Sequence, residues 1–367
     1  MSTAIVTATT TPTTTPSTEL DHSLDTPGPS ILHLEHINLE HPSQPIATLF
    51  YTALLSLTLD PHRTCSSNTL WFNIGQQQFH IQSRGGKECK TRGAVGLVLA
   101  RQQWEELDER WQEVRSIEEV TATQMSVERR TADSKSVKAQ LVCEHWDVLR
   151  PGEEKQEEGG GVPYYHIVGP WGQLYEVYCA ATSTLDERSI GMAYIEELLP
   201  ASALGDVVQY YQRYFNTAAE LIADTDGGSV ASVTVGTRQR LLFRLPAASS
   251  SSFTPTVPDD ASWHYAIYLG PFAHIFHSLD SDGLVHSWGS GRSDCVTDWQ
   301  SAKAAMQFRA FHIKAGPGNE VVWRLEQEVR CGKHMHYNRR LVNERQMRAK
   351  ERWNDLQQNG IQPPHAR

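Results

Sequence analysis

Three short apolar segments of the sequence each carry a side chain that can bind a metal ion or move a proton. His36 lies in HLEHINL, His80 in QFHIQ and Glu176 in LYEVYC. Because alternate residues of a strand share a face, each of these side chains falls on the more polar face of its segment. Imidazole and carboxylate groups are also the side chains from which proteins build divalent-metal sites and general bases.

Other polar residues share these faces and would line the same surface. They are Asn38 beside His36, Gln78 and Gln82 beside His80, and Tyr178 beside Glu176. The opposite faces are apolar, with Ile37 and Leu39 in the first segment. The pattern therefore predicts strands that pack on helices with one face and offer the other face to a small polar ligand.

The strands that carry these residues belong to a pattern that occurs four times along the chain. Each unit has a short strand, a helix with paired aromatic residues or Trp, and further strands. The first and third helices contain the pairs Phe50-Tyr51 and Tyr210-Tyr211 at matching places. We expect an α+β protein with one domain over residues 31–182 and a second over residues 190–330, joined near 183–190.

Composition narrows the class of protein. The 367 residues have 39% hydrophobic and 21% charged side chains and a formal net charge of −10. Such a chain is typical of soluble globular proteins. A negative balance argues against a nucleic-acid partner, which would require a basic surface. The sequence has no apolar stretch long enough to cross a bilayer, so we expect no membrane partner.

The ends of the chain and its cysteines complete this picture. Residues 1–30 are rich in Thr, Ser and Pro, so we expect a disordered tail rather than a targeting peptide. Residues 331–367 read as a charged C-terminal extension with a surface helix. The six cysteines contain no CxxC pair, which favours free thiols and a cytoplasmic location.

The order of these segments resembles the vicinal oxygen chelate superfamily of glyoxalases, extradiol dioxygenases and bleomycin-resistance proteins. The similarity is carried by HLEHINLEHP with LFYTALLSL, LWFNIGQQQFHIQ, RGAVGLVLA and GPWGQLYEVY, and later by WHYAIYLG and GNEVVWRLEQEVR. It covers about residues 31–330. The resemblance implies four βαβββ modules that pair into two glyoxalase-like domains, each enclosing a cup. In the superfamily, metal ligands come from the first and last strands of the modules.

Transferred position by position, the resemblance implies that His36, His80 and Glu176 hold a divalent metal, with Glu176 also the catalytic candidate. A fourth ligand is missing, because the string that often reads Gly-His-Ile-Gly in relatives is Gly93-Ala94-Val95-Gly96 here. Two imidazoles and one carboxylate suit Fe, Mn, Ni or Zn. Asn38, Gln78, Gln82 and Tyr178 would then contact the substrate.

The second half offers a weaker set of ligands. His264 and Glu326 match the first-strand and last-strand positions of the fourth unit, whereas the third unit has Tyr194 and then Leu241 or Leu242. Leucine cannot bind metal, so we expect the second domain to be structural or to bind an organic ligand.

Three functions remain open at this point. The leading one is a metal-dependent enzyme, a lyase or dioxygenase, whose substrate is chelated through neighbouring oxygens. The others are a metal-free protein that sequesters a small molecule and a structural tandem without activity. The sequence also leaves open whether units of one chain close each cup or are exchanged in a homodimer.

Overall fold

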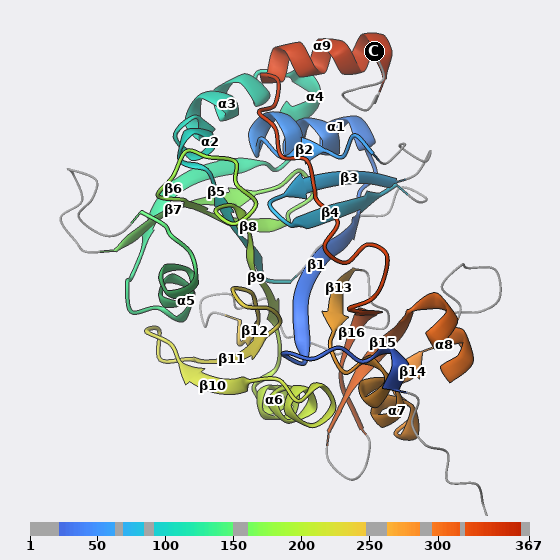
Figure 1. The fold of residues 1–367 in the computed structure, drawn as a ribbon. Helices are drawn as coiled ribbons and strands as arrows, with labels where there is room; N and C mark the ends of the chain where they lie inside the picture. The colour runs from blue at the N-terminus through green and yellow to red at the C-terminus, as the bar shows by residue number, and fades with distance from the viewer. Residues whose placement is uncertain are drawn as a thin grey trace, which may run out of the picture.

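A computed structural model describes residues 22–62, 69–83, 92–149, 161–246, 263–286, 296–315 and 320–360. Most of the predicted disordered tail, and the acidic glycine-rich segment near residue 155, lie outside these ranges. Within them the chain forms two sheets with helices packed against them (Figure 1). No described helix has both the length and the apolar character needed to span a membrane.

The first sheet has eight strands in the order β14-β15-β16-β13-β1-β4-β3-β2. Its strands are β1 (Ile31–Glu40), β2 (Thr58–Leu59), β3 (Thr69–Ile74), β4 (Gln77–Gln82), β13 (His264–Leu269), β14 (Val285–His286), β15 (Gln307–Ala315) and β16 (Glu320–Cys331).

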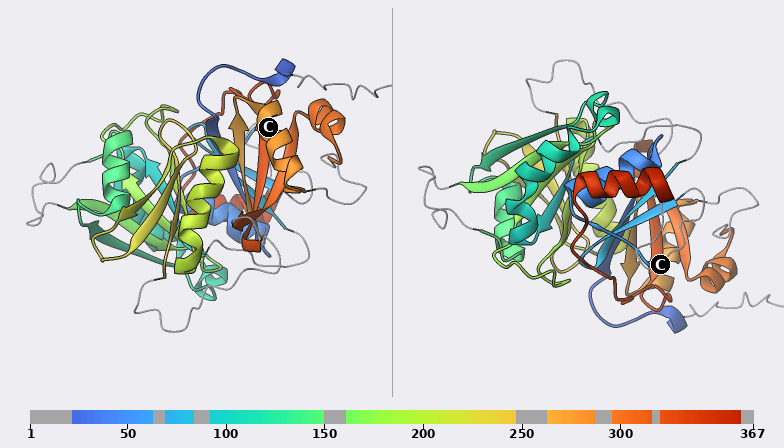
Figure 2. Two further views of the ribbon diagram at one scale, coloured as in Figure 1. Left: turned by 90° about the horizontal axis from the view of Figure 1, so that it is seen from below. Right: turned by 90° about the horizontal axis from the view of Figure 1, so that it is seen from above.

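The second sheet also has eight strands, in the order β10-β11-β12-β9-β5-β8-β7-β6. They are β5 (Ala94–Leu99), β6 (Ser126–Ala132), β7 (Val162–Val168), β8 (Leu174–Cys179), β9 (Gly191–Leu198), β10 (Ala219–Ala223), β11 (Ser229–Thr234) and β12 (Arg240–Arg244). Figure 2 shows the two sheets as separate halves, one green to yellow and the other blue and orange.

Four modules build these sheets, as the sequence predicted. In each module the first strand lies parallel to the last, namely β1 to β4, β5 to β8, β9 to β12 and β13 to β16. The helices are α1 (Gln44–Thr48) with the π-helical turn η2 (Leu49–Leu54), α2 (Arg101–Glu105), α3 (Leu107–Val114), α4 (Glu118–Thr121), α5 (Val137–His145), α6 (Ala201–Phe215), α7 (Phe272–Ser281), α8 (Trp299–Ala305), α9 (Ala349–Asn359) and the short η1 (His22–Leu24). The α+β class is confirmed.

The pairing of the modules differs from the sequence prediction. We expected the first module to share a sheet with the second, within residues 31–182, and the third with the fourth. Instead β1 pairs antiparallel with β13, and β5 pairs antiparallel with β9. The first module therefore joins the fourth, and the second joins the third. Alternation along a strand specifies its two faces but not which strand lies at its edge, so the local pattern could not reveal this arrangement.

The paired aromatic residues connect the two halves. Tyr51 packs on Phe79 of the first sheet, and its hydroxyl lies 2.7 Å from that of Tyr175 on the second. The third module repeats the contact, because Tyr211 packs on Phe243 of the second sheet and its hydroxyl bonds to Tyr265 of the first. One continuous apolar core thus includes residues from the helices and both sheets. The other face of each sheet lies outside this core.

Candidate functional site

The first strand has the two faces that the sequence predicted. Ile37 and Leu39 are fully buried in the core, and His36 and Asn38 lie on the other face. A break in the β1–β13 register between Leu34 and His36 then places Glu35 beside His36. The Glu35 carboxylate lies 3.1 Å from Nδ1 of His36. An irregularity of one residue therefore gives His36 an acidic partner.

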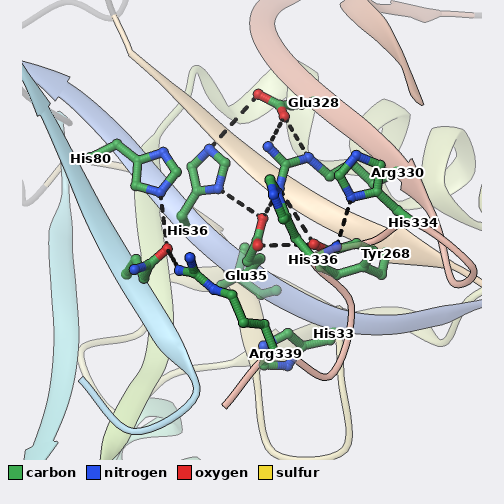
Figure 3. A network of polar contacts seen from close by, with 12 residues as sticks. His33, Glu35, His36, His80, Tyr268, Glu328, Arg330, His334, His336 and Arg339 are labelled. Atoms are coloured by element: carbon green, nitrogen blue, oxygen red, sulfur yellow. Dashed lines mark hydrogen bonds and ion pairs between the residues drawn. The ribbon is translucent and has the colours of Figure 1, made fainter. Parts of the chain in front are cut away.

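Three further strands bring side chains to His36. The ring of His80 from β4 stacks on it with centroids 3.6 Å apart, and the ring of His264 from β13 lies edge-on at 5.8 Å. Glu328 from β16 lies 3.8 Å from Nε2 of His36 and 3.5 Å from Nε2 of His264. We call the face that carries these four residues the first cup. Figure 3 shows three of them, His36, His80 and Glu328.

The four residues occupy two pairs of equivalent positions. His36 is paired with Ala266, and His264 is paired with Asn38, so the two histidines are related by an approximate twofold axis between β1 and β13. His80 lies beside Asn38, two residues after His36. Glu328 lies beside Ala266, two residues after His264. The fourth-module equivalent of His80 is therefore Glu328 and not the predicted Glu326. Glu326 lies two residues earlier on the same face of β16.

The predicted residue Glu176 lies on the other sheet and does not join His36 and His80. Glu176 lies beside Gly96 of β5, and Gly96 is paired with Tyr194 of β9. In the first sheet, Ala266 is paired with His36 in the same way, so Tyr194 is equivalent to His36. The second cup, defined by the positions equivalent to those of the first, consists of Tyr194, Leu242, Ala94 and Glu176. The sequence predicted seven of these eight positions, with Leu242 as one of two choices and Glu326 in place of Glu328, but it divided them between the wrong pairs of modules.

The predicted polar residues follow the same division. Asn38, Gln78 and Gln82 belong to the first cup face, with Asn38 and Gln78 buried and Gln82 partly exposed at the end of β4. Tyr178 belongs to the second, where its hydroxyl lies 3.2 Å from that of Tyr194.

Two arginines that sequence reasoning missed neutralise much of the acidic charge of the first cup. Arg309 from β15 donates to both Glu326 and Glu328, and Arg330 donates to Glu328 and Glu35. Burial alone would raise the pKa of Glu35, but Arg330 and the hydrogen bond from His36 lower it to about 2. Burial is likewise outweighed at Glu328, whose pKa Arg330 and Arg309 hold well below its ordinary value. Both carboxyl groups are therefore ionised at neutral pH.

A signal for Arg330 was present in the sequence, since EVR places it on the same strand face as Glu328. Arg309 lies on another strand, and only the β15–β16 register brings it opposite Glu328. No local pattern predicts that contact.

His36 and His80 of the first cup are uncharged. Burial lowers the pKa of His36, and it lowers that of His80 well below the ordinary value. Because the Nδ1–H group of His36 donates a hydrogen bond to the Glu35 carboxylate, Nε2 carries the lone pair. This Nε2 atom is buried and has no hydrogen-bond partner among the described residues. A buried imidazole nitrogen with a free lone pair can accept a hydrogen bond or bind a metal ion.

The second cup is filled by the protein itself. Helix α5, inserted between β6 and β7, packs on this face in a separate apolar cluster that includes Tyr194 and Leu242. Nζ of Lys138 lies 2.9 Å from Glu176 and 3.0 Å from Glu196. Burial alone would lower the pKa of Lys138, but these two carboxylates raise it. An internal ammonium group therefore balances Glu176.

A cavity of about 290 Å³ lies beside the first cup. Glu35 and Tyr268 line it, whereas His36, His80, His264 and Glu328 do not. The Tyr268 hydroxyl donates to Glu35 at 2.9 Å, so one hydrogen-bonded step connects the cavity wall to His36. The opposite wall is formed by residues 336–341 of the C-terminal segment.

Known proteins share little sequence with this chain. No protein-family model and no curated protein matches the sequence. Glyoxalase I from Zea mays is similar in structure, with a TM-score of 0.48 and 8% identity over 84% of this chain and 97% of that chain. A Bacillus subtilis protein proposed to be a dioxygenase has a TM-score of 0.48 and 12% identity, covering 93% of this chain and 99% of its own.

An extradiol ring-cleaving dioxygenase from B. fuscum has a TM-score of 0.26 and 13% identity over 89% of this chain and 78% of that chain. Similarities at this level assign no activity to this chain. Its two sheets are built from four βαβββ modules, the first paired with the fourth and the second with the third.

Proposed function

We propose that the first cup binds a divalent metal ion through His36, His264 and Glu328, with His80 as a fourth donor. The protein would then be an enzyme for small molecules that are chelated through two neighbouring oxygens. One observation carries the proposal: the ligand atoms that His36, His264 and Glu328 offer all lie within 4.8 Å of one another. Two imidazoles and a carboxylate suit Fe, Mn, Ni or Zn.

The residues present fit such an ion. Nε2 of His36 is buried, has no hydrogen-bond partner among the described residues and lies 3.8 Å from Glu328, and the neutral form of His36 is the form that binds metals. The charges of the first cup also favour a bound cation. Three carboxylates, Glu35, Glu326 and Glu328, face two guanidinium groups, Arg309 and Arg330, so the first cup has one more carboxylate than guanidinium group.

A bound divalent ion supplies a Lewis acid that stabilises negative charge on a chelated oxygen. The protein's own groups have separate tasks. Glu35 orients His36 through its Nδ1 proton, and Arg309 and Arg330 fix the direction of Glu328. Such outer hydrogen bonds keep ligands in place.

The alternative is a metal-free binding protein. It is favoured by Arg309 and Arg330, because between them they contact every carboxylate of the first cup. In that case the cup is a polar surface for a small ligand, and Nε2 of His36 accepts a hydrogen bond from that ligand.

Metal analysis of protein purified without a chelator tests the proposal. Wild-type protein is expected to hold a stoichiometric divalent metal, and His264→Ala is expected to lose it. Glu176→Gln is the matched control, because Glu176 occupies in the second cup the position of Glu328 in the first; this variant should keep the metal. Absence of metal from wild type after anaerobic reconstitution with Fe, Mn, Ni and Zn would overturn the proposal.

The reaction type needs a second experiment. Reconstituted protein would be assayed with a catechol and with a 2-oxoaldehyde, which distinguish ring cleavage from glyoxalase-type isomerisation. If metal-free protein is stabilised against heat by either compound and no turnover follows with metal, sequestration is the better description.

A further inference from the structure

The C-terminal segment between β16 and α9 crosses the first cup (red in Figure 1). Asn343 exchanges two hydrogen bonds with the backbone of Gly75, each 2.9 Å long. The Thr58 hydroxyl and the backbone of Glu344 are joined by hydrogen bonds of 2.8 and 3.1 Å. The segment is thus held against the β2–β3–β4 edge of the sheet by specific polar contacts.

Two of its groups reach the residues beside His80. The carbonyl oxygen of Val342 accepts a hydrogen bond of 2.9 Å from Nδ2 of Asn73. Nη2 of Arg339 lies 3.0 Å from Asp60 and 3.1 Å from Oε1 of Gln78. In Figure 3, Arg339 and Glu328 lie on opposite sides of the His36–His80 pair.

These contacts define the orientation of two amides. Because Nδ2 of Asn73 donates to Val342, its Oδ1 atom faces Gln78 and accepts from Nε2 of Gln78 at 2.6 Å. Nε2 of Gln78 also donates to the Asp60 carboxylate at 2.8 Å. A rotated Gln78 amide would place its oxygen against two acceptors, Asp60 and Asn73, and its nitrogen against the Arg339 guanidinium. Only one orientation of the Gln78 amide satisfies Asp60, Asn73 and Arg339 together.

The orientation of Gln78 then decides which nitrogen of His80 carries the proton. Oε1 of Gln78 lies 3.3 Å from Nε2 of His80 and can only accept. A neutral imidazole has one ring proton, and opposite this acceptor that proton is on Nε2. The lone pair is therefore on Nδ1, free to act as a donor within the cup.

We propose that the C-terminal segment belongs to the functional site, with Arg339 as a positioning residue that sets the tautomer of His80 through Gln78. This inference rests on the proposed metal site for its consequence, but the tautomer itself is a property of the metal-free protein. Through this segment, a residue far from His80 in the sequence orients the fourth donor, as Glu35 orients His36.

The experiment is nitrogen-15 NMR of the histidine rings in metal-free protein, together with Mn²⁺ titration. In wild type, His80 should be the Nε2–H tautomer. The variant Arg339→Met/Asn343→Ala frees the segment from Gln78 and Gly75, so His80 should become a mixture of tautomers. Mn²⁺ should then bind roughly 10-fold to 100-fold more weakly, the range seen when outer-shell partners of metal ligands are removed.

Matched variants separate positioning from general damage. Arg340→Met removes an exposed arginine of the same segment that has no ion pair among the described residues, and it should change neither readout. Arg339→Lys keeps a donor for Gln78 and should restore the single tautomer. Gln78→Leu removes the acceptor and gives the spectrum of an unconstrained His80.

The two proposals can fail separately. A single Nε2–H tautomer with unchanged Mn²⁺ affinity in Arg339→Met/Asn343→Ala overturns the positioning role. Failure of wild type to bind any Mn²⁺ overturns the metal site, whereas the tautomer spectra still decide the role of Arg339.

Discussion

Glu328 and Glu176 occupy equivalent positions in the two cups, yet they meet different cations. Glu328 is bound by the guanidinium groups of Arg309 and Arg330 and lies within reach of two histidines. Glu176 is bound by the ammonium group of Lys138, which α5 inserts into the cup. The first cup therefore has side chains that can bind a metal ion, whereas in the second cup the positive charge beside the glutamate is the lysine side chain.

The lysine in the second cup leads to a prediction about stability. Substituting Lys138→Met leaves the buried Glu176 and Glu196 without their shared cation. Removal of one partner from a buried ion pair typically costs about 3–5 kcal/mol, so the free energy of unfolding should fall by about that amount. Urea denaturation measures the change. Lys135→Met, an exposed lysine two residues before α5, is the control and should be nearly neutral. A loss equal to that of the control would contradict the buried pairing.

The ion pair between Glu35 and Arg330 predicts a dependence on acid. The pKa of Glu35 is lowered from 4.5 to about 2 in the folded protein. The unfolded chain therefore binds more protons between these values, and the free energy of unfolding decreases as pH falls from about 4.5 towards 2. The contribution is on the order of 3 kcal/mol.

Glu35→Gln tests this assignment, because it removes the titrating group. Compared with wild type, the variant should be less stable at pH 7, and the difference should shrink as pH falls below 4.5. Urea titrations at several pH values give the comparison. A difference that stays constant down to pH 2.5 would show that Glu35 is not the group that titrates.

Much of the fold could be predicted because its signals are local. Alternation in HINL assigns Ile37 to the core and His36 to the cup, and the Phe50-Tyr51 and Tyr210-Tyr211 pairs identify equivalent helices. These features depend on neighbouring residues, which a single sequence displays directly.

The composition of the site could be predicted only in part, because it depends on pairing between distant strands. His36 and His80 belong to one module and were correctly associated. Their other neighbours, His264 and Glu328, follow from the β1–β13 contact, which joins residues more than 200 positions apart. Glu35 depends on a one-residue irregularity in that same pairing, which no local pattern marks.

Gly96 offers a test of how tightly the second cup is filled. A methyl group at this position would lie 2.2 Å from the ring of Tyr194. Gly96→Ala should therefore lower the free energy of unfolding by about 1–3 kcal/mol through overpacking. The matched control is Gly205→Ala in α6, where nothing lies within 4 Å of the added methyl group. Alanine is the better helix former, so this control should be stabilised by up to about 1 kcal/mol, measured by thermal unfolding. Equal effects at the two positions would indicate that Tyr194 does not fill the cup.

Glu197 on β9 predicts a pH dependence of the opposite sign from that of Glu35. Burial raises its pKa from 4.5 to about 7, and Arg92, 4.0 Å away, offsets this only in part. The folded protein therefore binds more protons than the unfolded chain between pH 4.5 and 7. The free energy of unfolding should consequently fall as pH rises through this window, by about 3 kcal/mol at most. Glu197→Gln carries no such charge, so its stability relative to wild type should increase from pH 4.5 to pH 8, as measured by urea denaturation. A stability difference that does not change with pH would mean that Glu197 is already ionised in the folded protein at acidic pH.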